Sequence, residues 1–196
     1  MQGLFNFIVK QKGDIYNNTK KIDGIDFILN NSISEFKYIN RNAIIIAIPK
    51  NIKTNIKIGD EVIVHHNVFR RWYNKEGEEK VSFSYIKKDL YHVNEDQIYL
   101  YKKNNNWFAY NGYTFIKPIL NKDKFTLKIE NQNKGIVKYT DGVFNVGELV
   151  GFNPRVNHEF IIDDELLYKI PNNFIEIIYE YQGNEETYNP SWAQSS

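Results

Sequence analysis

The side chains best able to do chemistry in this chain are its histidines and one acidic run. His65 and His66 are adjacent at the end of an expected strand, so their rings should point to opposite faces and cannot easily share one metal ion. His92 and His158 are isolated in the sequence. Asp163-Asp164-Glu165 has carboxylates for acid–base chemistry or Ca²⁺ binding, but no other ligand spacing supports either, so a solvated hairpin turn is favoured.

The residues and motifs that the sequence lacks exclude several kinds of structural and catalytic site. The chain has no cysteine, which excludes a disulfide framework, a thiolate zinc site and a cysteine nucleophile. It also has no phosphate-binding loop, nucleophile elbow or zinc-protease motif. We therefore expect no enzymatic activity, no catalytic residues, no metal and no cofactor.

A basic and aromatic run, Phe69-Arg70-Arg71-Trp72-Tyr73, is a candidate for binding rather than catalysis. Its composition is typical of a platform for single-stranded nucleic acid on a small barrel. It is equally typical of a contact between subunits or a hairpin tip, because arginine and aromatic residues are enriched at interfaces. With 25 basic and 24 acidic residues the chain lacks the basic excess of dedicated nucleic-acid or membrane-surface proteins, so the interface is favoured.

The elements that must position these residues are expected to be strands. The sequence is 42% hydrophobic and 15% aromatic, which excludes disorder as the main state, and no segment keeps a long helical apolar period. Many short strands at close spacing indicate a sandwich or barrel. The expected strands are 5–10, 43–49, 61–66, 80–86, 90–93, 97–102, 107–110, 114–119, 135–139, 148–152, 158–162, 167–170 and 174–181.

The two halves of the chain match in the same order. The sequence 58–64 matches 146–152, and 90–93 matches 167–170, a register that also carries Ile98 onto Ile175. Weaker matches join 7–10 with 115–118 and 43–45 with 136–138. This internal similarity predicts two copies of one small all-β domain, at 1–103 and 107–182, followed by a flexible polar tail at 183–196.

One long insertion distinguishes the first half. About residues 11–42 separate its first two matching strands, whereas the second half uses only residues 120–134. Loops of this length that have no secondary structure of their own are usually functional or disordered. The insertion carries Gly24-Ile25-Asp26-Phe27-Ile28-Leu29 between asparagine-rich flanks. An ordinary strand of the domain is the alternative, but the flanks and the lack of a counterpart favour an exposed docking element at Phe27-Ile28-Leu29.

The order of these motifs resembles the GroES-type co-chaperonin family. Ile58-Gly59-Asp60-Glu61-Val62 and Val146-Gly147-Glu148-Leu149-Val150 are similar to the family's turn before a barrel strand. Phe115-Ile116-Lys117-Pro118 is similar to its opening strand, and the segment 24–29 resembles its mobile loop. The tandem arrangement resembles double-domain co-chaperonins of chloroplasts and those encoded by large bacteriophages. The abundance of Asn, Ile and Lys suggests an AT-rich genome and makes a phage origin attractive.

The resemblance implies a fold, a partner and an assembly. The fold is two tandem GroES-like irregular small β-barrels, the first with a long mobile loop at about 11–42. The partner is a GroEL-type chaperonin in its ATP-bound form, bound through Gly24, Ile25, Phe27, Ile28 and Leu29. Because linking weak contacts adds avidity, a homo-oligomeric ring is expected. One loop per chain and the seven-membered ring of the chaperonin imply about seven chains. The alternatives are a phage structural or assembly ring protein built from the same barrels, and an OB-like single-strand binder that depends on Arg70, Arg71 and Trp72.

The sequence also bears on the compartment. Its start has no basic segment followed by a long apolar stretch, so no signal peptide is expected. The longest apolar run, 43–49, is far below the roughly 20 residues of a membrane-spanning helix. We therefore expect a soluble cytoplasmic protein, located in the host cytoplasm if phage-encoded, with no membrane partner.

Overall fold

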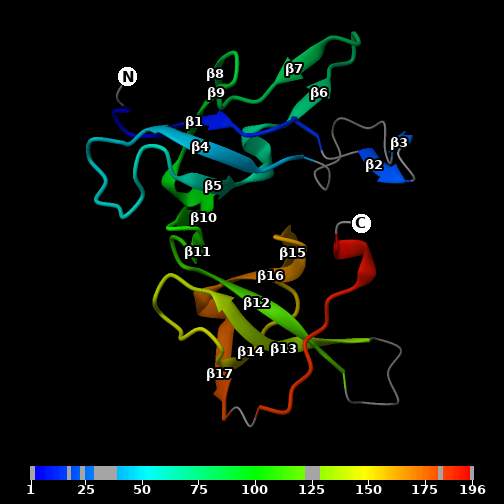
Figure 1. The fold of residues 1–196 in the computed structure, drawn as a ribbon. Helices are drawn as coiled ribbons and strands as arrows, with labels where there is room; N and C mark the ends of the chain where they lie inside the picture. Colours follow the sequence, from blue (N-terminus) through cyan, green and yellow to red (C-terminus); the bar gives the residue numbers. More distant parts are fainter. Residues whose placement is uncertain are drawn as a thin grey trace. The chain divides into compact units, whose positions relative to one another are not determined.

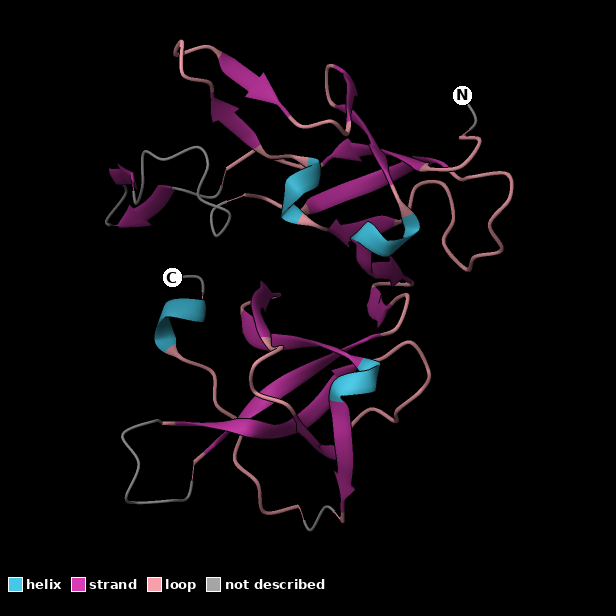
Figure 2. Ribbon diagram, turned by 180° about the vertical axis from the view of Figure 1, so that it is seen from behind, coloured by secondary structure: helices cyan, strands magenta, loops and turns pink. Residues whose placement is uncertain are grey.

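A computed structural model of the chain shows an all-β protein (Figure 1). The structure describes residues 3–16, 19–22, 25–28, 39–121, 129–180 and 183–194. The only helices in these segments are three-residue 3₁₀ turns, seen in cyan in Figure 2. None of the described helices is long and apolar enough to span a membrane. The chain divides into a first unit, Met1–Asn106, and a second unit, Trp107–Ser196.

The first unit contributes six antiparallel strands to a sheet of seven, and the seventh strand begins at Asn106, the last residue of this unit. In spatial order the strands are β11 (Asn106–Ala109), β10 (Ile98–Lys103), β5 (Glu61–Val64), β4 (Asn42–Ala47), β1 (Phe7–Gln11), β9 (Leu90–Val93) and β8 (Tyr85–Lys87). Two further antiparallel pairs stand apart from it. These are β2 (Thr19–Ile22) with β3 (Ile25–Ile28), and β6 (Arg71–Tyr73) with β7 (Glu79–Val81).

The second unit is built on a six-stranded antiparallel sheet. Its spatial order is β15 (His158–Ile162), β16 (Glu165–Pro171), β12 (Tyr113–Leu120), β13 (Glu130–Tyr139), β14 (Leu149–Phe152) and β17 (Ile175–Tyr179). Its core gathers apolar side chains from several of these strands, among them Ile116, Val137, Val150, Leu166 and Tyr168.

The two sheets share one strand order. Read from one edge, the first unit runs β10-β5-β4-β1-β9-β8 and the second runs β17-β14-β13-β12-β16-β15. The turn before β5 and the turn before β14 are also alike. Gly59 (φ 93°) donates its N–H to Ile45 O at 2.8 Å, and Gly147 (φ 92°) donates to Val137 O at 2.9 Å. Glycine suits both turns because an L side chain rarely adopts this φ.

The structure places some of the sequence matches in equivalent positions and shifts others. Leu90–Val93 and 167–170 are equivalent, because His92 lies opposite Ile8 and Lys169 lies opposite Phe115. The opening strands, however, match one residue away from the predicted alignment. A bulge follows Ile8 in β1 and Phe115 in β12, which makes these two residues equivalent. Both strands bury consecutive residues there, so no apolar alternation marks the register.

Other expectations at the level of the elements need correction. The predicted strand 80–86 is two strands, β7 and β8, because the chain turns at Ser82, whose hydroxyl donates to Val68 O. The expected flexible tail is instead attached to its own unit, through backbone hydrogen bonds of Glu186 and Tyr188 with β12 and through Ala193 in the core cluster. That the units are GroES-like barrels related by duplication stays a prediction.

Candidate functional site

Hydrogen bonds join the two ends of the first unit's insertion at the point where it leaves the sheet. After β1 the chain turns at Gly13 (φ 78°), and buried Asn40 spans the gap, with its Nδ2 donating to Lys12 O and Asp14 O, both at 2.8 Å. The Asn40 side-chain oxygen accepts the Asn42 N–H at 3.0 Å, just as β4 begins. These bonds hold together the two ends of a long insertion, as an asparagine with satisfied donors and acceptors can do.

Within this insertion lies a hairpin rather than a continuous loop. β2 pairs with β3 from Thr19 opposite Ile28 to Ile22 opposite Ile25. The predicted chaperonin-binding residues Ile25, Phe27 and Ile28 are therefore on a strand, which corrects the expectation of a simple loop, and that strand is outside the seven-stranded sheet. The dipeptide between the strands is Asp23-Gly24, a sequence that favours two-residue hairpin turns and could have indicated this hairpin. Gly24 and Leu29 lie outside the described residues.

The five residues of the basic and aromatic run do not form one surface. Phe69 is fully buried, with its ring 4.8 Å from that of Tyr91 in an edge-to-face contact. Arg70 is exposed, with its guanidinium carbon 5.9 Å from the centre of the Trp72 ring. Arg71 donates to Glu79 Oε1 at 2.9 Å across the hairpin, while Tyr73 is exposed. The structure thus splits the run into a core anchor and a hairpin strand.

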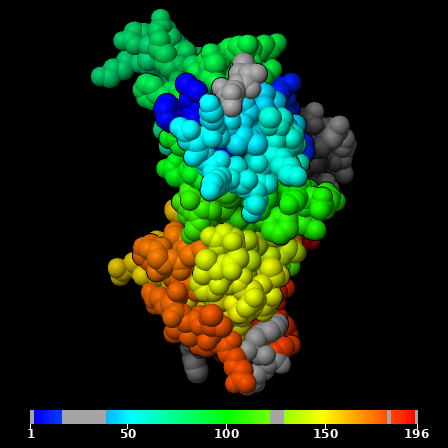
Figure 3. All heavy atoms as spheres, turned by 90° about the vertical axis from the view of Figure 1, so that its left-hand side faces the viewer, coloured from blue at the N-terminus to red at the C-terminus, as the bar shows by residue number. Residues whose placement is uncertain are grey.

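The β6–β7 hairpin projects from the first unit, as the blue-green atoms of Figure 3 show. An exposed apolar group that the sequence did not reveal begins at the end of β7 and continues into the segment after it. Phe83 is 96% exposed, and the other members of this group are Val81, Tyr85 and Ile86. The sequence gives no signal for them, because it alternates regularly from Val81 to Tyr85 and it is the serines, not the large residues, that the structure buries.

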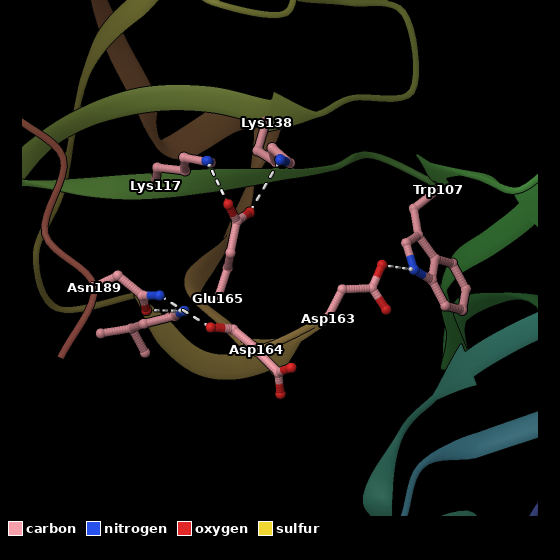
Figure 4. Close-up of polar contacts among 8 residues, drawn as sticks. Trp107, Lys117, Lys138, Asp163, Asp164, Glu165 and Asn189 are labelled. Atoms are coloured by element: carbon pink, nitrogen blue, oxygen red, sulfur yellow. Dashed lines mark hydrogen bonds and ion pairs between the residues drawn. The ribbon is translucent and has the colours of Figure 1, made fainter. Parts of the chain in front are cut away.

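The acidic run 163–165 of the second unit does not converge on a shared site (Figure 4). Glu165 accepts from Lys117 Nζ at 2.6 Å and pairs with Lys138 Nζ at 3.0 Å. Asp163 accepts from the Trp107 indole N–H at 3.0 Å, and the Asp164 carbonyl accepts from Asn189. Positive φ angles at Asp163 and Asp164 make this the turn between β15 and β16. The carboxylates of Asp163 and Glu165 and the carbonyl of Asp164 thus have structural partners.

The charge state of Glu165 agrees with a structural role. Partial burial acts to raise the pKa of its carboxyl, but hydrogen bonds from Lys117 and Lys138 outweigh burial and hold that pKa below its ordinary value. A carboxylate kept ionised between two ammonium groups is a poor general acid at neutral pH. The arrangement therefore favours an ion-pair network that joins β12, β13 and β16.

The rings of His65 and His66 do not point to opposite faces, as the sequence predicted. The 3₁₀ turn that begins at His66 brings the His65 and His66 rings into a stack with centroids 4.2 Å apart, not on opposite faces of a strand. His65 Nδ1 accepts the Asn67 N–H at 3.0 Å and so caps this turn. Throughout the described segments, no group of three or more histidine, aspartate or glutamate side chains could hold a metal ion.

Comparison with models of protein families, with curated protein sequences and with solved structures finds no match for this chain. We identify two candidate functional elements from the structure itself, because both lie outside the seven-stranded sheet. They are the insertion with its hairpin and the projecting β6–β7 hairpin. Both leave the same sheet of the first unit.

Proposed function

We propose that this protein is a co-chaperonin that caps a GroEL-type chaperonin in its ATP-bound form and helps to enclose folding proteins. The observation that carries the proposal is the insertion between β1 and β4. It holds an apolar strand, Ile25–Ile28, outside the seven-stranded sheet. The equivalent connection in the second unit, from β12 to β13, spans only residues 121–129. The chain thus offers one docking element, in its first unit.

The energetics of this docking element demand several copies. Burial of Phe27, Ile28 and Leu29 would contribute roughly 1.5–3 kcal/mol each. Ordering a free segment costs about 1–2 kcal/mol for each residue. The backbone pairs of β2 and β3 reduce that cost, since part of the segment is already ordered in the free chain. A single element would still bind weakly, so the cap is proposed to be a ring whose linked contacts add avidity.

A surface for ring formation is proposed at β17, the last strand of the second sheet. Its Ile177 is 48% exposed and Ile178 is 57% exposed. The equivalent residues of β10 in the first unit, Leu100 and Tyr101, are buried. An edge strand with two bare isoleucines is a ready template for pairing with another chain. Head-to-tail pairing of this kind closes into a ring when the rotation allows it.

We expect the double variant Ile177→Lys/Ile178→Lys to be monomeric where the wild type forms a ring. Two buried ammonium groups at a strand interface would each have to be desolvated, which costs several kcal/mol per group. Native mass spectrometry and sedimentation velocity measure the change. Val143→Lys, at an exposed site in the turn between β13 and β14 and on no edge strand, is the matched control and should keep the ring. A monomeric wild type, or a ring that survives the double substitution, would contradict this assignment.

The cap itself is tested by capture of a purified GroEL-type chaperonin with and without ATP. Wild type should be captured only with ATP, and the double variant Phe27→Ser/Leu29→Ser should lose at least tenfold in affinity, because the buried apolar area disappears. Phe83→Ser removes an equally apolar, highly exposed side chain outside the insertion and should bind as wild type does. Capture of neither wild type nor variant would reject the cap. A ring without capture would favour the structural-ring alternative.

A further inference from the structure

The sheet of the second unit ends in two edge strands that run in opposite directions. β15 and β17 are the first and last strands in its spatial order, and each has five residues. All pairings between neighbouring strands of this sheet are antiparallel, and six strands then leave the two edges with opposite directions. A second copy of the chain that lies beside the first with its strand directions unchanged would pair its β15 antiparallel with β17.

In β15, the backbone groups of Ile161 point to the free side of the strand. A turn of two residues, both with positive φ, joins β15 to β16, and in such a hairpin the flanking residues Ile162 and Glu165 form a hydrogen-bonded pair. Because hydrogen-bonded pairs alternate along the strands, the N–H and C=O of Ile161 point away from β16. Leu166, opposite Ile161, agrees with this, since its N–H is bonded to Asn189 Oδ1 at 3.0 Å.

In β17, the residue whose backbone groups point to the free side is Ile178. Val137 of β13 donates its N–H to Glu148 O at 2.9 Å and therefore points toward β14. By alternation Gly135 also points toward β14, where it pairs with Val150. The groups of Val150 are thus directed to β13 and away from β17. Ile178 lies opposite Val150, so its own N–H and C=O point away from β14.

The side chains of Ile161 and Ile178 lie on the same face of the sheet. Ile161 is opposite Leu166 and Ile178 is opposite Val150, and both of these partners belong to the core cluster of the unit. Directly opposite residues of an antiparallel pair share a face, so both isoleucines continue the apolar face of that cluster to the edges. They are 53% and 57% exposed. Pairing of β17 with β15 of a second copy would bring them together and remove both from water.

The edge strands of the seven-stranded sheet are less suitable partners for β17. β8 has three residues, and its register with β9 is irregular. β11 has four residues. β15 has five residues in unbroken register with β16. Of these three edges, β15 therefore offers the longest regular row of backbone donors and acceptors.

We infer that β15 of one copy receives β17 of the next copy, with Ile161 opposite Ile178, so that the six-stranded sheets of successive copies form one continuous antiparallel sheet. The inference rests on the ring proposed above and names its second surface. The same register places Glu159 opposite Glu180, since residues two positions from an antiparallel pair are again opposite each other. Like charges in this arrangement weaken the pairing, so the register also predicts that a charge reversal at Glu159 strengthens it.

Disulfide cross-linking tests this pairing directly, because the chain has no cysteine of its own. Oxidation of the double variant Ile161→Cys/Ile178→Cys should give a ladder of covalent oligomers on a denaturing gel, since opposite residues of a hydrogen-bonded pair have Cα atoms about 5.5 Å apart. Each single variant should stay a single chain on the same gel. Val143→Cys/Ile178→Cys and Ile86→Cys/Ile178→Cys, both with exposed sites off β15, are the matched controls and should give no ladder.

Sedimentation velocity gives a second test that needs no cross-link. Ile161→Lys should prevent ring formation as completely as Ile177→Lys/Ile178→Lys does. Glu159→Lys should lower the Kd for association about threefold, because repulsion from Glu180 becomes attraction.

The outcomes separate this pairing from the other proposals. A ring that survives Ile161→Lys but not the β17 variant would overturn the pairing and leave the β17 surface in place. A ladder from Ile86→Cys/Ile178→Cys in place of the expected one would overturn it in favour of β8. A monomeric wild type would overturn the pairing together with the ring. Because no chaperonin is present, the expected ladder without ATP-dependent capture would support the pairing and reject only the cap.

Discussion

Replacing Gly135 by alanine is expected to destabilise the second unit by about 3 kcal/mol while the first unit keeps its stability. Gly135 lies in β13, opposite Pro118 of β12 and Val150 of β14. A Cβ added there would lie 2.4 Å from the Lys117 carbonyl oxygen and 2.5 Å from Ile116 Cγ2. The first contact is with backbone in the middle of a sheet, so a side-chain rotation cannot relieve it.

Thermal unfolding followed by calorimetry measures this effect. A loss of about 3 kcal/mol in a unit of this size corresponds to a decrease of roughly 12–24 °C in its midpoint. The control is Gly142→Ala, where a Cβ would meet open space and only the positive φ of 103° opposes the change. That control should cost about 1 kcal/mol. If Gly135→Ala unfolds at the wild-type temperature, β12 does not approach β13 as closely as described here.

Gly135 also shows what differs between the two sheets. The residue at the equivalent place in the first unit is Ala43, which is opposite Gln11 in β1 and Val62 in β5 and is fully buried. The first unit therefore accommodates a methyl group where the second unit accommodates only hydrogen. The inverse change, Ala43→Gly, should destabilise the first unit by only about 1 kcal/mol, since it removes one methyl and adds backbone freedom.

Deletion of residues 184–196 is expected to destabilise the second unit by a similar amount, about 3 kcal/mol. The tail forms two backbone hydrogen bonds with the end of β12, from Leu120 N to Glu186 O and from Tyr188 N to Pro118 O, both 2.8 Å. Ala193 is buried in the core cluster, against which Tyr188 also packs. Removal of the tail would expose this side of the core to water.

Asn189 is the most specific contact of the tail. Its Oδ1 accepts the Leu166 N–H at 3.0 Å, and its Nδ2 donates to the Asp164 carbonyl at 2.9 Å (Figure 4). Asn189→Ala alone should therefore produce about half of the loss caused by the deletion, because two backbone groups lose their partners. Trp192→Ala, at an exposed side chain, should change the stability little. Unfolding in denaturant measures both effects. Equal free energies of unfolding for the full-length and shortened chains would contradict the docking of the tail.

The proposed docking residues illustrate the limit of prediction from sequence. The composition of 24–29 marks an apolar segment between polar flanks, and the structure places 25–28 on a strand outside the main sheet. The interface run 69–73 was a prediction from composition alone, and only the structure separates buried Phe69 from exposed Tyr73. A surface and a core aromatic look alike in sequence because burial depends on which distant strands pack against them.

Local residue preferences are enough to predict the all-β class and the position of most strands. Runs of β-branched and aromatic residues favour strands locally, and Gly59 and Gly147 mark turns because few other residues adopt their φ. Three features are visible only in the folded chain: the register of β1 and β12, the exposure of Ile177 and Ile178 on an edge strand, and the docking of the tail. Each of these depends on contacts between residues far apart in the chain, and neither local propensity nor alternation encodes them.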